Sequence, residues 1–266
     1  MNKVGIDAGG TLTKVVYHER GLRHFKIFPS NDIGSLSQWI QWLSPSSEYY
    51  VTGGKAGKVK NLLKTAVQIP EFEAVCKGSA VLLSEEHQIG GPFILVNIGT
   101  GTSMFLVDQE KQEYRRLIGT GLGGGTLLGL GKILSGLDSF RDIISLAASG
   151  KRENVDLLVK DLYEDGDTPI PGRLTAANFA GDYKGKGNPN DSLRSLINMI
   201  AENTVLLAAR LAEMEGTKTI LFTGGALAGN HLLKTDLSQF QDILQYEPVF
   251  LANGAFSGAV GCIINS

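Results

Sequence analysis

The sequence Asp7-Ala8-Gly9-Gly10-Thr11-Leu12-Thr13-Lys14 follows the first apolar stretch of the chain, residues 3–6. The pattern predicts a strand, a turn at the two glycines, and two further strands ending at residue 28. Glycine has no Cβ, so the backbone N–H groups of such a turn and the Thr11 hydroxyl can approach phosphate oxygens. Asp7 is placed to bind Mg²⁺ directly or through water, and Lys14 to add positive charge. Taken alone, an ordinary glycine hairpin explains the loop equally well.

The same pattern begins again after Gly90-Gly91-Pro92, which signals a boundary. Its loop is Asn97-Ile98-Gly99-Thr100-Gly101-Thr102-Ser103, which joins strands predicted over 93–98 and 102–108 and precedes a third over 114–118. Two such loops at matching points can face each other across a cleft and hold the two ends of a polyphosphate. We therefore expect an α/β protein with an N-terminal lobe, residues 1–90, and a C-terminal lobe, residues 91–266.

Apolar spacing elsewhere favours helices and a few short strands. Helices are predicted over 32–43, 55–66, 71–86, 124–134, 139–148, 154–163, 191–215, 230–240 and 253–264, and strands over 49–52, 219–223 and 246–251. The helix over 191–215 contains no glycine or proline, and we expect it to form a dimer interface. A core within one chain would satisfy its apolar face equally well.

A third glycine-rich loop, Gly119-Thr120-Gly121-Leu122-Gly123-Gly124-Gly125-Thr126, opens a predicted helix and formally contains G-x-G-x-x-G. It does not fit a dinucleotide-binding unit, because it follows three meandering strands and no acidic residue ends a strand about 20 residues later. A helix start with free N–H groups still favours an anion.

Two pairs of glycines end predicted strands, Gly53-Gly54 and Gly224-Gly225. The later pair suits the close approach of a flat ring such as adenine, or simply a tight turn from strand to helix. The earlier pair precedes Lys55-Ala56-Gly57-Lys58, whose spacing differs from that of a P-loop and which lacks the Ser or Thr that would reach Mg²⁺. We therefore expect no P-loop there.

The composition excludes several classes of protein. Glycine accounts for 34 of 266 residues, against about 19 at ordinary usage, but only 8 prolines and no Gly-X-Y period occur, so a collagen or a disordered chain is excluded. A formal charge of −2 without long runs of one sign argues against nucleic-acid binding. We expect a cytoplasmic protein for two reasons. Cys76 and Cys262 are isolated from each other and from other metal-ligand patterns, and the sequence has no pattern of a signal peptide or a membrane span.

Taken together, these loops resemble those of the sugar kinase, Hsp70 and actin superfamily, and the chain closely resembles type II pantothenate kinases over nearly its whole length. The matching segments are 7–11, 97–103, 119–125, Pro169-Ile170-Pro171-Gly172, Leu174-Thr175-Ala176-Ala177-Asn178-Phe179 and Asn253-Gly254-Ala255-Phe256-Ser257-Gly258-Ala259. The resemblance implies a two-lobed actin-like ATPase of duplicated, ribonuclease H-like β-β-β-α-β-α lobes, with ATP in the cleft between them. It also implies a homodimer that uses ATP and Mg²⁺ to phosphorylate pantothenate to 4′-phosphopantothenate, the first step of coenzyme A synthesis.

The same resemblance implies roles for single residues. Glu71 matches the catalytic base, with Glu73 as its nearest competitor, and Arg116 matches an active-site cation. On the residues alone, a first-turn acid of a helix is the favoured interpretation of Glu71, and an exposed strand cation is the alternative for Arg116. The implied ATP-binding positions are Asp7, Ala8, Gly9, Gly10, Thr11, Leu12, Thr13, Lys14, Thr100, Gly124, Gly125, Thr126, Leu127, Leu128, Phe140 and Gly225. Asp7 is also a catalytic residue and the metal ligand, directly or through water. An aromatic residue such as Phe140 more often belongs to the core.

Two other functions stay open at this point. One is a kinase for a sugar or another small alcohol, although the carboxylate in an Asn-Asp type loop that sugar kinases usually need is not evident. The other is a non-catalytic ligand sensor, because fold alone does not set function. Val249-Phe250 replace tyrosines of close relatives, which bears on the identity of the acceptor.

Overall fold

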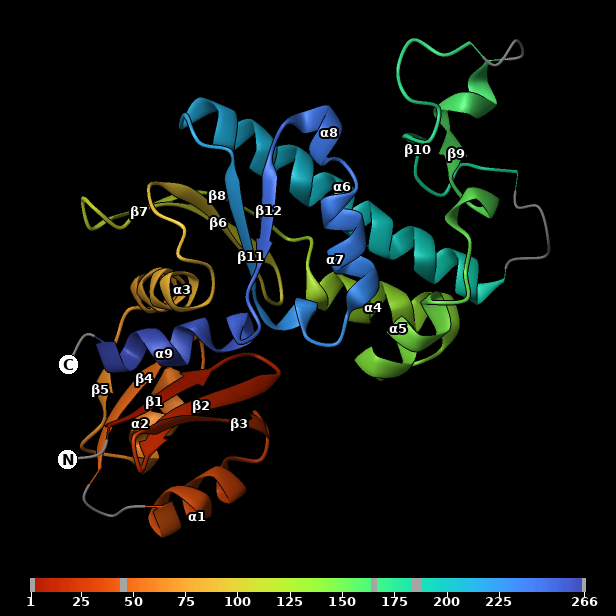
Figure 1. The fold of residues 1–266 in the computed structure, drawn as a ribbon. Helices are drawn as coiled ribbons and strands as arrows, with labels where there is room; N and C mark the ends of the chain where they lie inside the picture. The colour runs from red at the N-terminus through yellow and green to blue at the C-terminus, as the bar shows by residue number, and fades with distance from the viewer. Residues whose placement is uncertain (1–2, 44–46, 164–166, 183–187, 265–266) are drawn as a thin grey trace.

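The computed structural model describes residues 3–43, 47–163, 167–182 and 188–264. Two five-stranded sheets form its framework (Figure 1). The first sheet contains β1 (Lys3–Ala8), β2 (Leu12–Glu19), β3 (Leu22–Pro29), β4 (Glu48–Thr52) and β5 (Val67–Gln68). The second contains β6 (Phe93–Ile98), β7 (Thr102–Asp108), β8 (Glu113–Thr120), β11 (Thr219–Thr223) and β12 (Glu247–Phe250).

Both sheets have the same topology. The first runs in the order β3-β2-β1-β4-β5 and the second in the order β8-β7-β6-β11-β12. In each, the first strand pairs antiparallel with the second and parallel with the fourth. The predicted duplication is therefore confirmed, and it places the end of β1 and the end of β6 at corresponding points of the two sheets.

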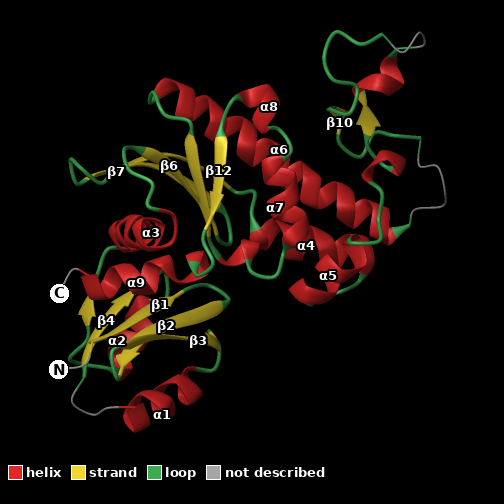
Figure 2. Cartoon of the chain, viewed as in Figure 1, coloured by secondary structure: helices red, strands yellow, loops and turns green. Residues whose placement is uncertain are grey.

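Nine α-helices lie in the described part of the chain and surround the sheets (Figure 2). They are α1 (Ile33–Leu43), α2 (Ala56–Leu62), α3 (Glu71–His87), α4 (Gly124–Ser135), α5 (Phe140–Ala147), α6 (Pro189–Met214), α7 (His231–Ser238), α8 (Gln241–Leu244) and α9 (Ser257–Ile264). Two predicted helices are shorter than expected. The helix expected over 55–66 ends at residue 62, and a 3-10 turn over Gly254–Phe256 precedes α9.

Helices α3 and α9 lie between the two sheets (Figures 1 and 2). They cross at backbone contact, because a Cβ placed on Gly78 would lie 1.9 Å from the Ser257 carbonyl oxygen, and one on Gly261 1.8 Å from the Ala74 carbonyl oxygen. Helix α9 also packs on β1, where a Cβ on Gly5 would lie 2.0 Å from the Ala259 carbonyl oxygen. The last helix of the chain thus returns to the first sheet, while the division of the chain at residue 90 stays a prediction.

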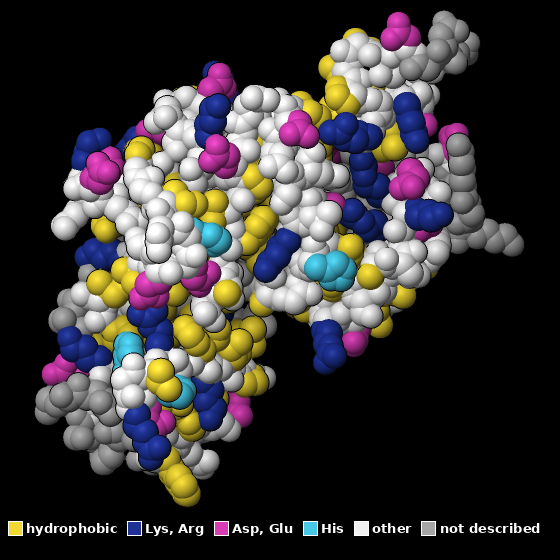
Figure 3. All heavy atoms as spheres, in the orientation of Figure 1, with side chains coloured by type: hydrophobic (Ala, Val, Ile, Leu, Met, Phe, Trp, Pro, Cys, Tyr) yellow, Lys and Arg dark blue, Asp and Glu magenta, His cyan; other side chains and the backbone are white. Residues whose placement is uncertain are grey.

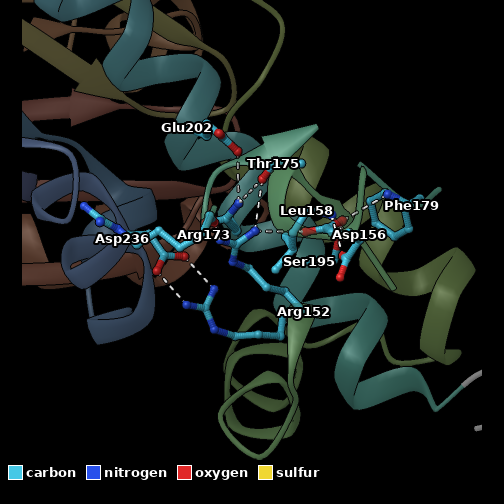
Figure 4. A network of polar contacts seen from close by, with 12 residues as sticks. Arg152, Asp156, Leu158, Arg173, Thr175, Phe179, Ser195, Glu202 and Asp236 are labelled. Carbon is cyan, nitrogen blue, oxygen red and sulfur yellow. Dashed lines mark hydrogen bonds and ion pairs between the residues drawn. The ribbon is translucent and has the colours of Figure 1, made fainter. Parts of the chain in front are cut away.

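The helix predicted over 154–163 is wrong. The structure has 3-10 turns over Arg152–Asn154 and Val159–Leu162, with a short strand β9 (Leu157–Leu158) between them that pairs with β10 (Thr175–Ala177). The cause is Asp156, which is buried and accepts hydrogen bonds from the Phe179 N–H and the Ser195 hydroxyl (Figure 4). These tertiary bonds outweigh the helical spacing of the apolar residues.

The two cysteines are free and buried, Cys76 on α3 and Cys262 on α9. Burial raises the pKa of each thiol to about 12, so both stay protonated at neutral pH and pack as small apolar groups. Within the described ranges, no helix is both long and apolar enough to cross a bilayer. On the face in Figure 3, basic and acidic side chains are both present over the sheets and helices.

Candidate active site

A cavity of about 770 Å³ opens where the ends of strands β1 and β6 approach each other. Fourteen of the predicted site residues line it: Asp7, Gly9, Gly10, Thr11, Leu12, Lys14, Glu71, Thr100, Arg116, Gly124, Gly125, Leu128, Phe140 and Gly225. The structure therefore brings together loops that lie as far apart in the chain as Asp7 and Gly225, which are 218 positions apart.

Four predicted positions, Ala8, Thr13, Thr126 and Leu127, are not among the residues that line the cavity. Three of them are buried, and Thr13 exchanges a 3.0 Å hydrogen bond with Ser30. The Thr126 hydroxyl donates to the Gly121 carbonyl at 2.7 Å. These residues support the loops from behind and do not face the cavity.

The first two glycine loops face each other across the cavity. A Cβ on Gly10 would lie 3.4 Å from the Thr100 hydroxyl oxygen, so the loop tips almost touch. Asp7 is the last residue but one of β1, and Asn97 is the last residue but one of β6. Asn97 lines the cavity and was absent from the predicted site, although its place in the repeat was a signal that could have found it.

Asp7 is held among groups that leave its carboxylate little freedom. Its partner across the β1–β2 pair is Lys14, whose Nζ lies 3.5 Å from Asp7 Oδ2. A Cβ on Gly53 would lie 2.7 Å from Oδ1, and one on Gly258 3.0 Å from Oδ2. Burial raises the pKa of Asp7, and Lys14 opposes that shift. The carboxyl is therefore short of favourable partners in the described chain.

Glu71 is the first residue of α3 and lines the cavity. The protein atoms around its carboxyl reduce hydration and raise its pKa, the negative charge of Asp7 raises it further, and Lys14 lowers it. The neighbouring Glu73 does not line the cavity and forms a 2.6 Å ion pair with Lys77. A raised pKa suits a group that must take up a proton near neutral pH.

Arg116 reaches the cavity from β8 because the strand contains a bulge. Met104 pairs with Ile118 and Phe105 with Arg116, so Leu117 is left without a partner on β7. The Arg116 guanidinium lies 5.4 Å from the centre of the Phe72 ring, one residue from Glu71.

Its neighbour Arg115 has a different environment. Arg115 Nη2 lies 2.7 Å from Glu215 Oε2, beyond the end of α6, and Arg115 does not line the cavity. Consecutive residues of a strand point to opposite faces, so only the second arginine of the pair faces the cavity.

The glycine-rich loop before α4 differs from the expectation of free N–H groups. The Gly124 N–H donates to the Gly99 carbonyl and the Gly125 N–H to the Thr100 carbonyl, each at 2.8 Å. A Cβ on Gly123 would lie 2.8 Å from the Thr100 carbonyl oxygen. These glycines hold the loop around Thr100 against the start of α4, and the N–H groups of Gly124 and Gly125 are not available to an anion.

The two diglycine turns have the same backbone conformation and the same kind of close contact. Gly53 and Gly224 both have positive φ, 93° and 106°, which L residues with a Cβ rarely adopt. A Cβ would lie 2.6 Å from the Ala8 carbonyl oxygen at Gly53 and 2.3 Å from the Ile98 carbonyl oxygen at Gly224. Each turn therefore lies directly against the end of the first strand of its own sheet, which leaves Gly54 and Gly225 lining the cavity.

Solved structures of other proteins share this architecture. Component A of (R)-2-hydroxyglutaryl-CoA dehydratase from Acidaminococcus fermentans is 14% identical, with a TM-score of 0.64 over 100% of this chain and 97% of that one. A ROK family glucokinase from Streptomyces griseus, in complex with glucose and AMPPNP, is 14% identical, with a TM-score of 0.58 over 100% and 99%. At such identity the likeness shows the fold alone, and it confirms the predicted actin-like architecture.

Sequence relatives are much closer. The type II pantothenate kinase of Oceanobacillus iheyensis is 38% identical over 268 residues and covers the whole of both chains. Those of Bacillus cereus and Staphylococcus haemolyticus are each 36% identical, covering 98% of this chain and 96% and 98% of their own. The profile of the Fumble family matches residues 81–265. The chain therefore belongs to the Fumble family, together with these full-length type II pantothenate kinases.

Proposed function

We propose that this protein is a type II pantothenate kinase, which transfers the γ-phosphoryl group of ATP to the primary hydroxyl of pantothenate and so forms 4′-phosphopantothenate for coenzyme A synthesis. The observation that carries the proposal is the cavity, in which Asp7, Lys14, Glu71 and Arg116 meet between two facing glycine loops. Full-length relatives that carry this name supply the acceptor.

We assign the nucleotide to the side of the cavity formed by the glycine loops. The hairpin at Gly9-Gly10 and the loop around Thr100 would hold the phosphates from opposite sides, which their near contact supports. Leu128, Phe140 and Gly225 line the same cavity and would form the adenine site. Apolar side chains next to a glycine allow the close approach of a ring.

Glu71 is the general base of the proposed reaction. It accepts the proton of the pantothenate hydroxyl while that oxygen forms a bond to the γ-phosphorus, and the bond from this phosphorus to the oxygen it shares with the β-phosphate breaks to release ADP. The raised pKa of Glu71 and its place on the cavity wall support this role over Glu73, which is paired with Lys77 outside the cavity.

The cations at the site would stabilise the phosphoryl group during transfer. Lys14 lies beside Asp7 on the β1–β2 hairpin, and Arg116 lies over Phe72 next to Glu71. Such charges act most strongly in a site from which water is excluded. Ala8, Thr13, Thr126 and Leu127 act in this proposal as supports of the nucleotide loops and not as contacts.

Mg²⁺ fits the donor set that the chain offers. The ion is usually held by one or two carboxylates together with substrate phosphates and water, and Asp7 provides one partly enclosed carboxylate with a raised pKa on the cavity wall. Asp7 would hold the ion directly or through water. When bound, Mg²⁺ supplies positive charge to the oxygens of the β- and γ-phosphates.

A homodimer in the cytoplasm completes the proposal. Most apolar residues of α6 are buried within the chain, but Leu206, Leu207 and Met214 of this helix are exposed and support a partner there. Light scattering tests this point, since a monomeric mass at micromolar concentration contradicts the dimer. The free, buried Cys76 and Cys262 fit a reducing compartment.

The activity is tested with purified protein, Mg-ATP and pantothenate or a panel of sugars and small alcohols. We expect ADP release that depends on pantothenate, with 4′-phosphopantothenate identified by mass spectrometry. Release with a sugar alone would identify a sugar kinase on the same fold. Binding of ATP without turnover of any acceptor would point to a ligand sensor, and either result overturns the proposal.

A further inference from the structure

The segment Gly53-Gly54-Lys55-Ala56-Gly57-Lys58 lacks P-loop spacing, yet the structure places Lys55 at the first phosphate loop. The Lys55 Nζ donates a hydrogen bond to the Gly10 carbonyl at the tip of that loop. Its backbone N–H donates to the Ala8 carbonyl at 2.9 Å, so the residue is anchored beside the loop at two points.

Lys55 does not itself line the cavity, but the residues next to its ammonium group do. Gly10, whose carbonyl accepts the Lys55 hydrogen bond, and Gly54, which precedes Lys55, both line the cavity. A Cβ on Gly10 would lie 3.4 Å from the Thr100 hydroxyl oxygen, across the cavity. Lys55 itself is only half-buried and ends in a flexible chain. Rotation of this side chain can therefore change the position of Nζ while the backbone stays in place.

The charged side chains that line the cavity provide no excess of positive charge for a polyphosphate. Among the described lining residues, the carboxylates Asp7 and Glu71 are balanced by Lys14 and Arg116. Lys14 is already paired with Asp7, and Arg116 lies at the Phe72 side of the cavity. A nucleoside triphosphate brings several negative charges, so the first phosphate loop gains from a second ammonium group.

We propose that Lys55 is a phosphate-binding residue that exchanges its bond to the Gly10 carbonyl for the β- and γ-phosphates of a bound nucleoside triphosphate. This inference rests on the proposed kinase function, because it assigns the phosphates to the loop between Asp7 and Lys14. It adds a phosphate contact from the turn after β4, although that turn does not have the spacing of a P-loop.

Equilibrium binding of ATP and of AMP, in the presence of Mg²⁺, tests the assignment. Lys55→Gln keeps a hydrogen-bond donor for the Gly10 carbonyl but removes the charge. We expect ATP binding to weaken about tenfold, equivalent to about 1.4 kcal/mol, and AMP binding to change less than about twofold because AMP has no β- or γ-phosphate. Lys55→Arg should restore most of the ATP affinity.

Lys58→Gln is the matched control, since it removes the same charge from an exposed position of α2, three residues after Lys55. It should leave ATP binding unchanged. Raising the salt concentration should weaken ATP binding of the wild type more than that of Lys55→Gln.

The outcomes separate this inference from the proposed function. A wild type that does not bind ATP contradicts both. A wild type that binds ATP while Lys55→Gln behaves like Lys58→Gln overturns the role of Lys55 alone. Equal losses for ATP and AMP, or an equal loss in Lys55→Arg with a lower melting temperature, would show that Lys55 merely supports the loop, and would also overturn the inference.

Discussion

Lys14 Nζ lies 3.5 Å from Asp7 Oδ2, and the two residues face each other across the β1–β2 pair at the wall of the cavity. The ion pair does not fully replace the lost hydration of the carboxyl, because burial raises the pKa of Asp7 more than Lys14 lowers it. The glycines Gly53 and Gly258 close around the same group. The fold therefore holds Asp7 where its charged form is disfavoured. Groups with such shifted pKa values are common at functional sites.

Asp7→Asn should make the protein more stable at neutral pH and abolish phosphoryl transfer. A carboxyl whose pKa is higher in the folded than in the unfolded state stabilises the fold only while it is protonated, and this contribution is lost as the pH rises through the folded pKa. Asparagine has no carboxyl proton to lose, so the variant does not lose this stability as the pH rises. Thermal unfolding at pH 4 and pH 8 should show a larger gain for the variant at pH 8, and a variant less stable than wild type at pH 8 contradicts the account.

Glu71→Gln should lower kcat by about 10²- to 10⁴-fold, the usual contribution of a general base, and leave ATP binding almost unchanged. Because the pKa of Glu71 is raised, the wild type should gain activity with rising pH through a value above the ordinary 4.5 of glutamate. The variant should lack this limb of the pH profile. Steady-state kinetics and ATP titrations measure both effects.

Glu73→Gln is the control for that experiment, because Glu73 lies two residues further along α3 and pairs with Lys77 outside the cavity. It should retain most of the wild-type activity. Full activity in Glu71→Gln together with a large loss in Glu73→Gln would transfer the role of base to Glu73.

Four strands of the first sheet and all five of the second could be predicted from the sequence, because they are short apolar runs ended by glycine turns. The two-residue strand β5 was not predicted. The strands over 93–98, 102–108 and 219–223 have the predicted bounds, and the repeat between Asp7 and Asn97 follows from their alignment. The bulge at Leu117 could not be predicted, because it depends on the register between β7 and β8.

The role of the glycines in the loop before α4 also could not be predicted from the sequence. Glycines at a helix start indicate either an anion site or close backbone packing, and the sequence does not state which. Here the N–H groups of Gly124 and Gly125 bond to the loop around Thr100. The partners come from residues about 25 positions earlier, so only the three-dimensional contact between the two loops decides the outcome.

Gly78→Ala should destabilise the protein although alanine is the better helix former. An added Cβ would lie 1.9 Å from the Ser257 carbonyl oxygen, so α3 and α9 would have to separate, at a cost of about 1–3 kcal/mol for overpacking. Urea unfolding measures the change. Gly129→Ala in α4 is the control, since no atom lies within 4 Å of the added Cβ and this variant should gain about 0.5–1 kcal/mol. Equal behaviour of the two variants would contradict the close crossing.

Asp236→Ala should be among the most destabilising single changes in the C-terminal half. Arg194 on α6 donates two hydrogen bonds to the carboxylate of Asp236 on α7, at 2.5 and 2.6 Å, and Asp236 is fully buried. Removing one partner of a buried pair leaves the other charge without compensation, which costs about 3–5 kcal/mol. Urea unfolding should show this loss.

Glu213→Ala is the matched comparison, because it removes one partner of an ion pair of similar length, Arg210 with Glu213, in which both side chains are about two-thirds exposed (67% and 70%). Solvent weakens such a pair, so its loss should barely change the urea midpoint. A small effect of Asp236→Ala, close to that of Glu213→Ala, would mean that water reaches Arg194 when its partner is removed and that the contact between α6 and α7 rests on their apolar residues alone.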